Sequence, residues 1–133
     1  MSARVTSHES RVTIKSFTDL NAWREAHSLA VSIYKVTRKF PVEEQFGLTS
    51  QIRRATVSVT SNIAEGFGRR TSKDRLHFYD MARGSLAELQ SQLMISRDVG
   101  YIAESEFKPL ADKSIECHKV LTGLINATKG RDS

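Results

Sequence analysis

The histidine, glutamate and cysteine residues of this chain do not occur at the spacings that metal and haem sites of helical proteins require. The four histidines, His8, His27, His77 and His118, form no HxxxH or HExxH pair, and no glutamate is followed three residues later by histidine. Such spacings place metal ligands on one face of a helix. The chain also has no CxxCH haem attachment motif and no GxxxxGK[ST] loop. The sequence therefore predicts no metal, haem or other cofactor.

His27 and Cys117 are the two single residues with possible reactivity. His27 falls on an apolar seam, where it is either a general base or a hydrogen-bonded core residue, and the second interpretation is favoured. Cys117 is the single cysteine. It also falls on a seam, where a free cysteine usually behaves as a small hydrophobe, whereas a nucleophilic thiol needs a positive and partly exposed setting. One cysteine permits no internal disulfide, which favours a reducing cytoplasm.

A stripe of short polar side chains is the strongest candidate for a site. Ser58, Ser61, Asn62 and Glu65 share one side of a helix that is expected to be capped by Thr49 or Ser50 and to end near Gly66 or Gly68. One interpretation is a catalytic carboxylate with an orienting amide. The other is a structural polar cluster in which Arg53, Arg54 and Arg83 serve as ion partners of Glu65 and Glu88. No second acid or base completes a mechanism, so the structural interpretation is favoured and no catalytic residue is predicted.

Basic residues are concentrated in the middle of the chain. The sequence has a formal charge of +5, and the segment Gly47–Arg83 has seven lysines and arginines against three acids. Six of them are candidate phosphate contacts: Arg53, Arg54, Arg69, Arg70, Lys73 and Arg75. They form either a solvated face or a nucleic-acid surface that reads backbone and shape, because no aromatic residue is interleaved for base stacking. The Gly66-Phe67-Gly68 segment favours a turn over a phosphate cradle.

Apolar residues at spacings of three and four predict the helices that hold these residues. In the central helix the stripe comprises Leu48, Ile52, Ala55, Val59 and Ile63. A first helix, capped by Thr18 or Asp19 and running to about Lys39, has a seam of Leu20, Trp23, His27, Ala30, Tyr34 and Thr37. A third is expected from a Thr71 cap to about Val99, with its seam at Tyr79, Ala82, Leu86, Leu89, Leu93 and Ser96. A fourth, ending near Thr128, has Phe107, Leu110, Ser114, Cys117, Leu121, Leu124 and Thr128.

Four helices joined by short connections predict an all-α, up-down-up-down antiparallel four-helix bundle over residues 17–128. Residues 1–16 are expected to be a disordered tail or, alternatively, a basic arm that contacts a polyanion. Residues 129–133 are expected to fray. The chain contains no run of 18 apolar residues and no secretory h-region, so a cytosolic protein without membrane contact is expected. Because the central helix is small or apolar nearly all round, it is expected to pack on two sides and to promote self-association.

Three segments resemble a known family. FTDLNAWREAHSLAVSIYK, FPVEEQFGLTSQIRRATVSVTSNIAEGFGRR and FYDMARGSLAELQSQL resemble the bacterial four-helix-bundle proteins named after 23S rRNA intervening sequences. The accessory protein of diversity-generating retroelements belongs to the same family. The resemblance covers about residues 17–125, and Val59 and Thr60 stand where the family pattern has isoleucine and proline. It implies a ring-like homopentamer without catalytic activity, whose retroelement relatives bind RNA and a reverse transcriptase.

Two functional hypotheses follow. The first is a non-enzymatic oligomer that binds structured RNA, ribosomal or from a retroelement, through the basic segment. The alternative is a protein-interaction scaffold or accessory subunit that has no direct nucleic-acid role. An enzyme is a third hypothesis, which requires Asn62, Glu65 and an arginine to converge on an open pocket.

Overall fold

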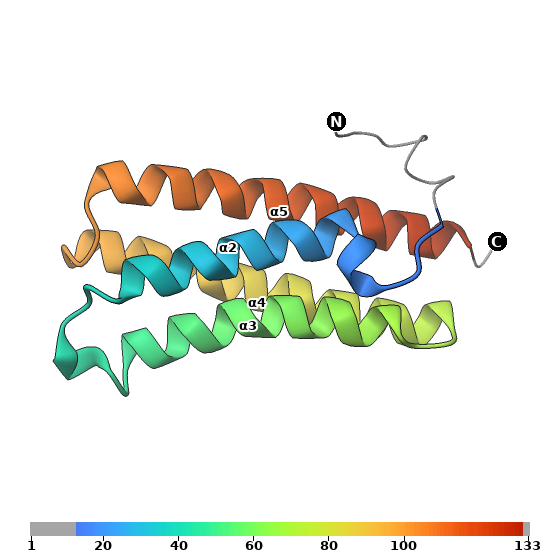
Figure 1. The fold of residues 1–133 in the computed structure, drawn as a ribbon, viewed down its shortest axis with the longest axis horizontal. Coiled ribbons are helices and arrows are strands. Elements are labelled where there is room, and N and C mark those ends of the chain that lie inside the picture. Colours follow the sequence, from blue (N-terminus) through green and yellow to red (C-terminus); the bar gives the residue numbers. More distant parts are fainter. Residues whose placement is uncertain (1–12, 132–133) are drawn as a thin grey trace.

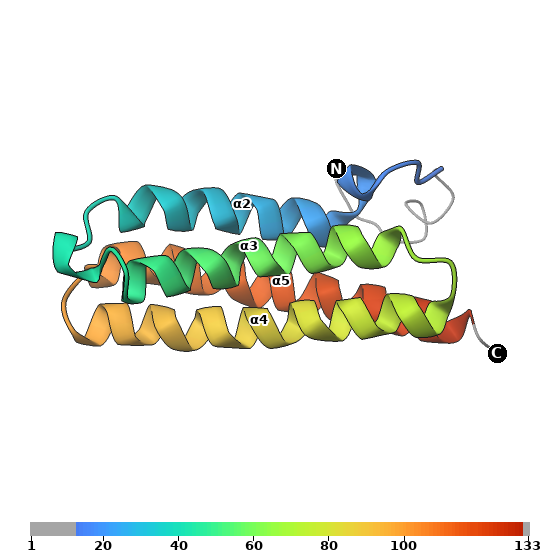
Figure 2. The ribbon, with the colours of Figure 1, turned by 90° about the horizontal axis from the view of Figure 1, so that it is seen from below.

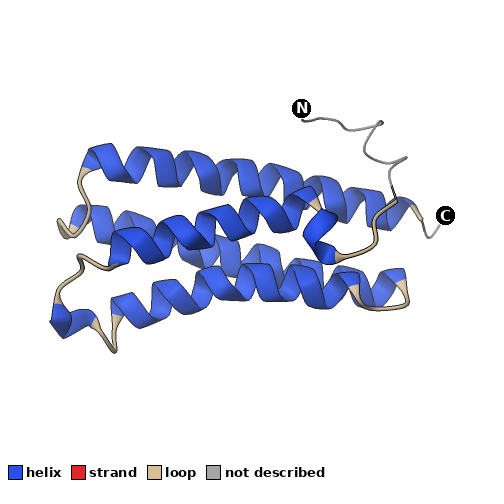
Figure 3. Ribbon diagram, viewed as in Figure 1, coloured by secondary structure: helices blue, strands red, loops and turns tan. Residues whose placement is uncertain are grey.

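The computed structural model describes residues 13–131, which fold into four long helices and two short 3-10 turns (Figure 1). The turns are η1 (Phe17–Asp19) and η2 (Val42–Glu44). The helices are α2 (Asn21–Thr37), α3 (Leu48–Phe67), α4 (Ser72–Asp98) and α5 (Glu104–Gly130). The described residues include no strand (Figure 3), so the predicted all-α class is confirmed.

Each helix lies antiparallel to the one before it along a shared long axis, and α5 returns to contact α2 (Figures 1 and 2). Helices α2 and α4 occupy opposite corners of the bundle (Figure 2). The α2–α3 and α4–α5 connections lie together at one end, named here the loop end. The α3–α4 connection lies at the other end with both ends of the described chain, and this is named the corner end. The predicted up-down-up-down topology is confirmed.

Local sequence determines where these helices begin and end. Thr71 caps α4 as predicted, since its hydroxyl accepts a hydrogen bond of 3.1 Å from the Asp74 amide. Gly100 has φ +86°, which a residue with a side chain rarely adopts, and the chain turns there after α4. The carboxylate of Glu106 accepts from the Ala103 amide at the start of α5. Helix α5 begins at Glu104, so Pro109 lies in its second turn.

The apolar stripes predicted for three helices form the core. In α3 and α4 they are buried, apart from a half-buried Leu48, and in α5 Leu124 is half-buried while the rest is buried. The seam predicted for α2 is only partly right. Ala30 and Thr37 are buried as expected, but His27 and Tyr34 are exposed. The rest of the core face is made by Ala22, Ala26, Leu29, Ile33 and Val36.

The error in α2 has a physical reason. Two neighbouring stripes of this helix both satisfy the spacing rule, one aliphatic and one aromatic with polar tips. The aliphatic stripe packs densely without burying a ring nitrogen or a hydroxyl. The aromatic stripe therefore lies at the edge of the bundle, where Trp23 stacks on His27 with ring centroids 4.7 Å apart.

The chain ends differ in detail from the expectations. Of the predicted tail, residues 1–12 lie outside the described residues, while Ser16 caps η1 and α2 begins only at Asn21. Lys129 and Gly130 belong to α5, and residues 132–133 lie outside the described part. Among residues 13–131, no helix combines the length and hydropathy that a bilayer crossing requires.

Candidate functional site

A close helix contact fixes the geometry of the corner end. Gly66 is buried in the last turn of α3, and a Cβ atom there would lie 2.7 Å from Cε1 of Tyr79 and 3.0 Å from Cβ of Phe78. Tyr79 is itself only 1% exposed. Glycine at position 66 therefore lets the end of α3 rest directly on α4. Gly68, the other glycine at which α3 was expected to end, has φ −79° and does not need the conformational freedom of glycine.

Two arginines hold the corner together. Arg69 forms an ion pair with Glu65, and its guanidinium lies 4.6 Å from the ring centroid of Phe78. Arg75 donates from Nε to the carbonyl oxygen of Arg69 at 2.8 Å. It also lies 5.7 Å from the ring centroid of Phe67. These two cations are used within the chain, so the connection from α3 to α4 is a braced turn.

The other two cations of this corner are free. The side chains of Arg70 and Lys73 are exposed, and neither side chain forms a hydrogen bond or ion pair with another described residue. Asp74 lies in the first turn of α4, where a carboxylate is stabilised by the helix dipole. The name "basic corner" is used below for Arg69, Arg70, Lys73 and Arg75.

The C-terminal end of α5 adds charge that the sequence analysis missed. Burial raises the pKa of Tyr79, while the nearby Arg75 and Arg131 act to lower that pKa. Both guanidinium groups are therefore close enough to Tyr79 to act on it electrostatically. The predicted up-down topology could have indicated this position of Arg131, because it brings the C-terminal end of α5 to the end of the bundle that holds the α3–α4 connection. Arg131 had instead been assigned to a frayed tail.

Arg53 and Arg54 do not belong to the basic corner. They precede Arg69 and Arg70 by sixteen residues, which along a helix is about 24 Å. Arg53 donates from Nε to the hydroxyl of Thr37 at 2.8 Å, and its guanidinium lies 4.7 Å from the Tyr34 ring centroid. Arg54 is exposed. The six residues predicted as one candidate surface are therefore divided between two places.

Hydrogen bonds join part of the predicted polar cluster. The hydroxyls of Ser58 and Ser85 lie 2.7 Å apart and link α3 to α4. Asn62 donates from Nδ2 to the carbonyl oxygen of Ser58 at 2.9 Å and to its hydroxyl at 3.0 Å. Ser61 is exposed and does not join this group. These contacts satisfy half-buried polar groups between two helices, which is a structural role.

The ion pairs expected for this cluster are wrong. Glu65 pairs with Arg69. Arg83 donates to Asp80 at 2.8 Å, and Glu88 accepts from Nε2 of Gln92 at 3.3 Å. All three contacts join residues three or four positions apart on one helix or at its end, where side chains meet without crossing to a neighbouring element.

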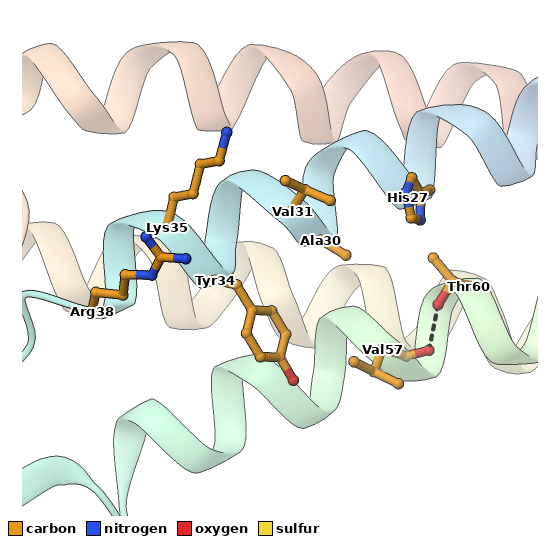
Figure 4. A pocket seen from close by; sticks show the side chains of 8 residues that line it. All are labelled: His27, Ala30, Val31, Tyr34, Lys35, Arg38, Val57 and Thr60. Atoms are coloured by element: carbon orange, nitrogen blue, oxygen red, sulfur yellow. Dashed lines mark hydrogen bonds between the residues drawn. The ribbon is translucent and has the colours of Figure 1, made fainter.

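A hollow of the described part of the chain lies elsewhere, in a groove between α2 and α3 (Figure 4). Its volume is about 330 Å³, and its lining is mostly apolar. The lining residues are His27, Ala30, Val31, Tyr34, Lys35, Arg38, Val57 and Thr60. Neither Asn62 nor Glu65 lines it, so this groove does not bring together the residues that the enzyme hypothesis required. His27 was expected to be a hydrogen-bonded core residue, but it lies at the edge of this groove.

The remaining reactive group is shielded. Cys117 is fully buried, and burial raises its pKa to about 12, with a smaller contribution from Glu25. Such a thiol stays protonated and is a poor nucleophile. Among the described residues no group of three or more His, Cys, Asp or Glu side chains could hold a metal ion.

Comparison with known proteins gives one family and one fold. The family model described as 23S rRNA-intervening sequence protein matches residues 18–123. A crystal structure of a protein of unknown function from the S23 ribosomal protein family of Bacteroides thetaiotaomicron is similar, with a TM-score of 0.71 and 24% sequence identity. The match covers 78% of this chain and 97% of that one. No protein with a curated description matches the sequence.

Proposed function

Because the chain belongs to the 23S rRNA-intervening sequence protein family, we propose that it is a non-enzymatic, self-associating helical bundle that binds structured RNA. The RNA is ribosomal RNA or an RNA of similar compact structure. The observation that carries the proposal is the basic corner, in which Arg70 and Lys73 are exposed without an acidic partner among the described residues. Unpaired cations on a rigid support are what a phosphate backbone requires.

The contacts at this corner suit phosphates better than bases. The two nearby rings, Phe67 and Phe78, are half-buried and are covered by Arg75 and Arg69. Base stacking needs an open ring face, so these rings are not available for it. Arg69 and Arg75 brace the turn, and Arg70 and Lys73 present charge to the ligand. Recognition would then depend on the spacing of phosphates in folded RNA and not on base sequence.

Self-association is supported by two separate apolar surfaces, one between α2 and α3 and one on α4. The groove between α2 and α3 exposes Val31, Tyr34 and Val57, and the cations Lys35 and Arg38 also line it. The outer side of α4 exposes the apolar residues Met81, Met94 and Ile95 and the acids Glu88 and Asp98. A contact between two such different surfaces is heterologous, and repeated by rotation it closes into a ring.

The number of copies is tested separately. The family resemblance implies a homopentamer. Five chains of 14.9 kDa each have a total mass of about 75 kDa. Light scattering should give this mass, and substituting Met94→Lys together with Ile95→Lys should reduce it at unchanged helicity. A monomer for the natural protein at micromolar concentration would contradict the proposed assembly.

RNA binding is tested by co-purification. When the protein is purified at low salt, its ratio of absorbance at 260 nm to that at 280 nm should indicate bound nucleic acid. A high-salt wash should remove this nucleic acid and lower the ratio. The Arg70→Ala, Lys73→Ala variant should carry less RNA than a matched variant, Arg54→Ala with Lys119→Ala, which loses the same two residue types elsewhere. Equal RNA content in both variants would refute the assignment to the basic corner.

A further inference from the structure

The loop end presents two apolar side chains to solvent in the connection between α2 and α3. Phe46 is 90% exposed and Val42 is 77% exposed. A lone exposed aliphatic residue is ordinary, but a phenylalanine with almost no intramolecular contact is not. Large apolar side chains of this kind are characteristic of binding surfaces, where aromatic anchors supply much of the affinity.

The segment that presents Phe46 is well ordered by its own hydrogen bonds. The carboxylate of Glu44 accepts 3.0 Å from the Leu48 amide and 2.8 Å from the hydroxyl of Tyr101, which joins the two connections of the loop end. The Gly47 amide donates to the carbonyl oxygen of Glu44 at 2.9 Å. A Cβ at position 47 would lie 2.8 Å from Glu44 Oε1, so glycine leaves room for this carboxylate. Phe46 is therefore held out from the bundle by a fixed turn, which limits the entropy that a partner must overcome.

The surroundings of Phe46 are acidic. Residues 41–47 and 98–106, which span the two connections, contain five acids and no lysine or arginine. Flanking cations neutralise two of these acids, since Lys39 pairs with Glu106 and Arg97 pairs with Asp98. Glu43 and Glu104 are exposed without an ion pair among the described residues. The loop end thus combines apolar anchors with unpaired negative charge, whereas the opposite end is basic.

We propose that the loop end is a docking surface for a basic, amphipathic segment of a partner protein. An apolar side chain of that segment would pack on Phe46 and Val42, and its lysines or arginines would face Glu43 and Glu104. Charge complementarity excludes nucleic acid as the occupant, because phosphates would be repelled here. This goes beyond RNA binding at the basic corner. The two surfaces lie at opposite ends of the bundle (Figure 1), so RNA and the partner protein can bind the same molecule together.

The test uses two labelled amphipathic peptides with the same leucine pattern, one with lysines and one with glutamates at the polar positions. Fluorescence anisotropy should show that the lysine peptide binds and that Phe46→Ala weakens this binding about tenfold, as expected for an aromatic anchor. Glu43→Gln with Glu104→Gln should weaken it further and reduce its dependence on salt. The matched control is Ile115→Ala, which removes an apolar side chain 50% exposed on α5 and should leave the affinity unchanged.

Three results would overturn the proposal. The first is equal affinity of the lysine peptide for the natural protein and for Phe46→Ala. The second is a glutamate peptide that binds as tightly as the lysine peptide and depends equally on Phe46. The third is a fall in oligomer mass caused by Phe46→Ala, because the occupant would then be another copy of this chain. Phe46 has few contacts within the fold, so its substitution should leave the helical circular dichroism unchanged.

Discussion

Replacing Gly66 by alanine should destabilise the protein, although the same change stabilises most helices. The new Cβ would lie 2.7 Å and 2.9 Å from two ring carbons of Tyr79 and 3.0 Å from Cβ of Phe78. The Tyr79 ring is buried and cannot move aside freely. Overpacking of this kind costs about 1–3 kcal/mol. The gain in helix propensity is at most about 1 kcal/mol, and it is smaller near a helix end. The expected net loss is about 1.5 kcal/mol of unfolding free energy, taking the middle of these ranges.

Gly123→Ala is the matched control, because a Cβ at this position in α5 would meet no atom within 4 Å. This variant should be more stable by roughly 0.5–1 kcal/mol. Urea unfolding followed by circular dichroism measures both changes. With a slope of about 1.5 kcal/mol per molar urea, the midpoint of Gly66→Ala should fall by about 1 M while that of Gly123→Ala rises. A rise in midpoint for both variants would refute the claim that α3 rests on Tyr79 through Gly66.

Three further predictions concern single groups in the bundle. Ser58→Ala and Ser85→Ala should each destabilise the protein, and a double-mutant cycle should give a coupling of about 0.5–1.5 kcal/mol; zero coupling would show that the hydroxyl contact contributes nothing. Hydrogen bonds from the Leu48 amide and then from Tyr101 lower the pKa of Glu44 below its ordinary 4.5. The ionised Glu44 carboxylate therefore stabilises the folded protein above pH 4.5, and this stabilisation is lost as the pH falls through the lowered pKa. The difference in urea midpoint between natural protein and Glu44→Gln should therefore shrink on acidification, and a difference independent of pH would contradict this. Cys117 should react with a disulfide reagent at pH 8 roughly 10³-fold more slowly in the folded than in the unfolded protein, and equal rates would show that the thiol is not shielded.

Much of the fold followed from periodicity because in three of the helices the predicted apolar stripe is the one that faces the core. In α4 and α5 these stripes contain most of the large aliphatic or aromatic residues that are buried, such as Leu86, Leu93, Phe107 and Leu121. Helix α2 has two acceptable stripes, and only packing against α3 and α5 decides between them. His27 was misplaced for this reason.

The candidate site was less predictable because charge pairs depend on the arrangement of side chains. Sequence alone brought Arg53 and Arg69 into one set, although helix length separates them. The partner of Glu65 is a neighbour on the next turn and not an arginine of another helix. Arg131 was missed since its contribution depends on where the end of α5 lies in space. The exposure of Phe46 could not be predicted from the sequence, because an aromatic residue in a connection between helices can equally pack against the core.

The salt dependence of RNA affinity tests the central claim most directly. The natural protein should bind a folded fragment of 23S rRNA with log Kd rising linearly with log salt concentration, at about 0.7–0.9 per phosphate contacted. Arg70→Ala with Lys73→Ala should reduce this slope by about 1.4–1.8 for the two lost contacts, and Arg54→Ala with Lys119→Ala should leave it unchanged. An unchanged slope in the first variant, or an equal loss in both, would contradict RNA binding at the basic corner.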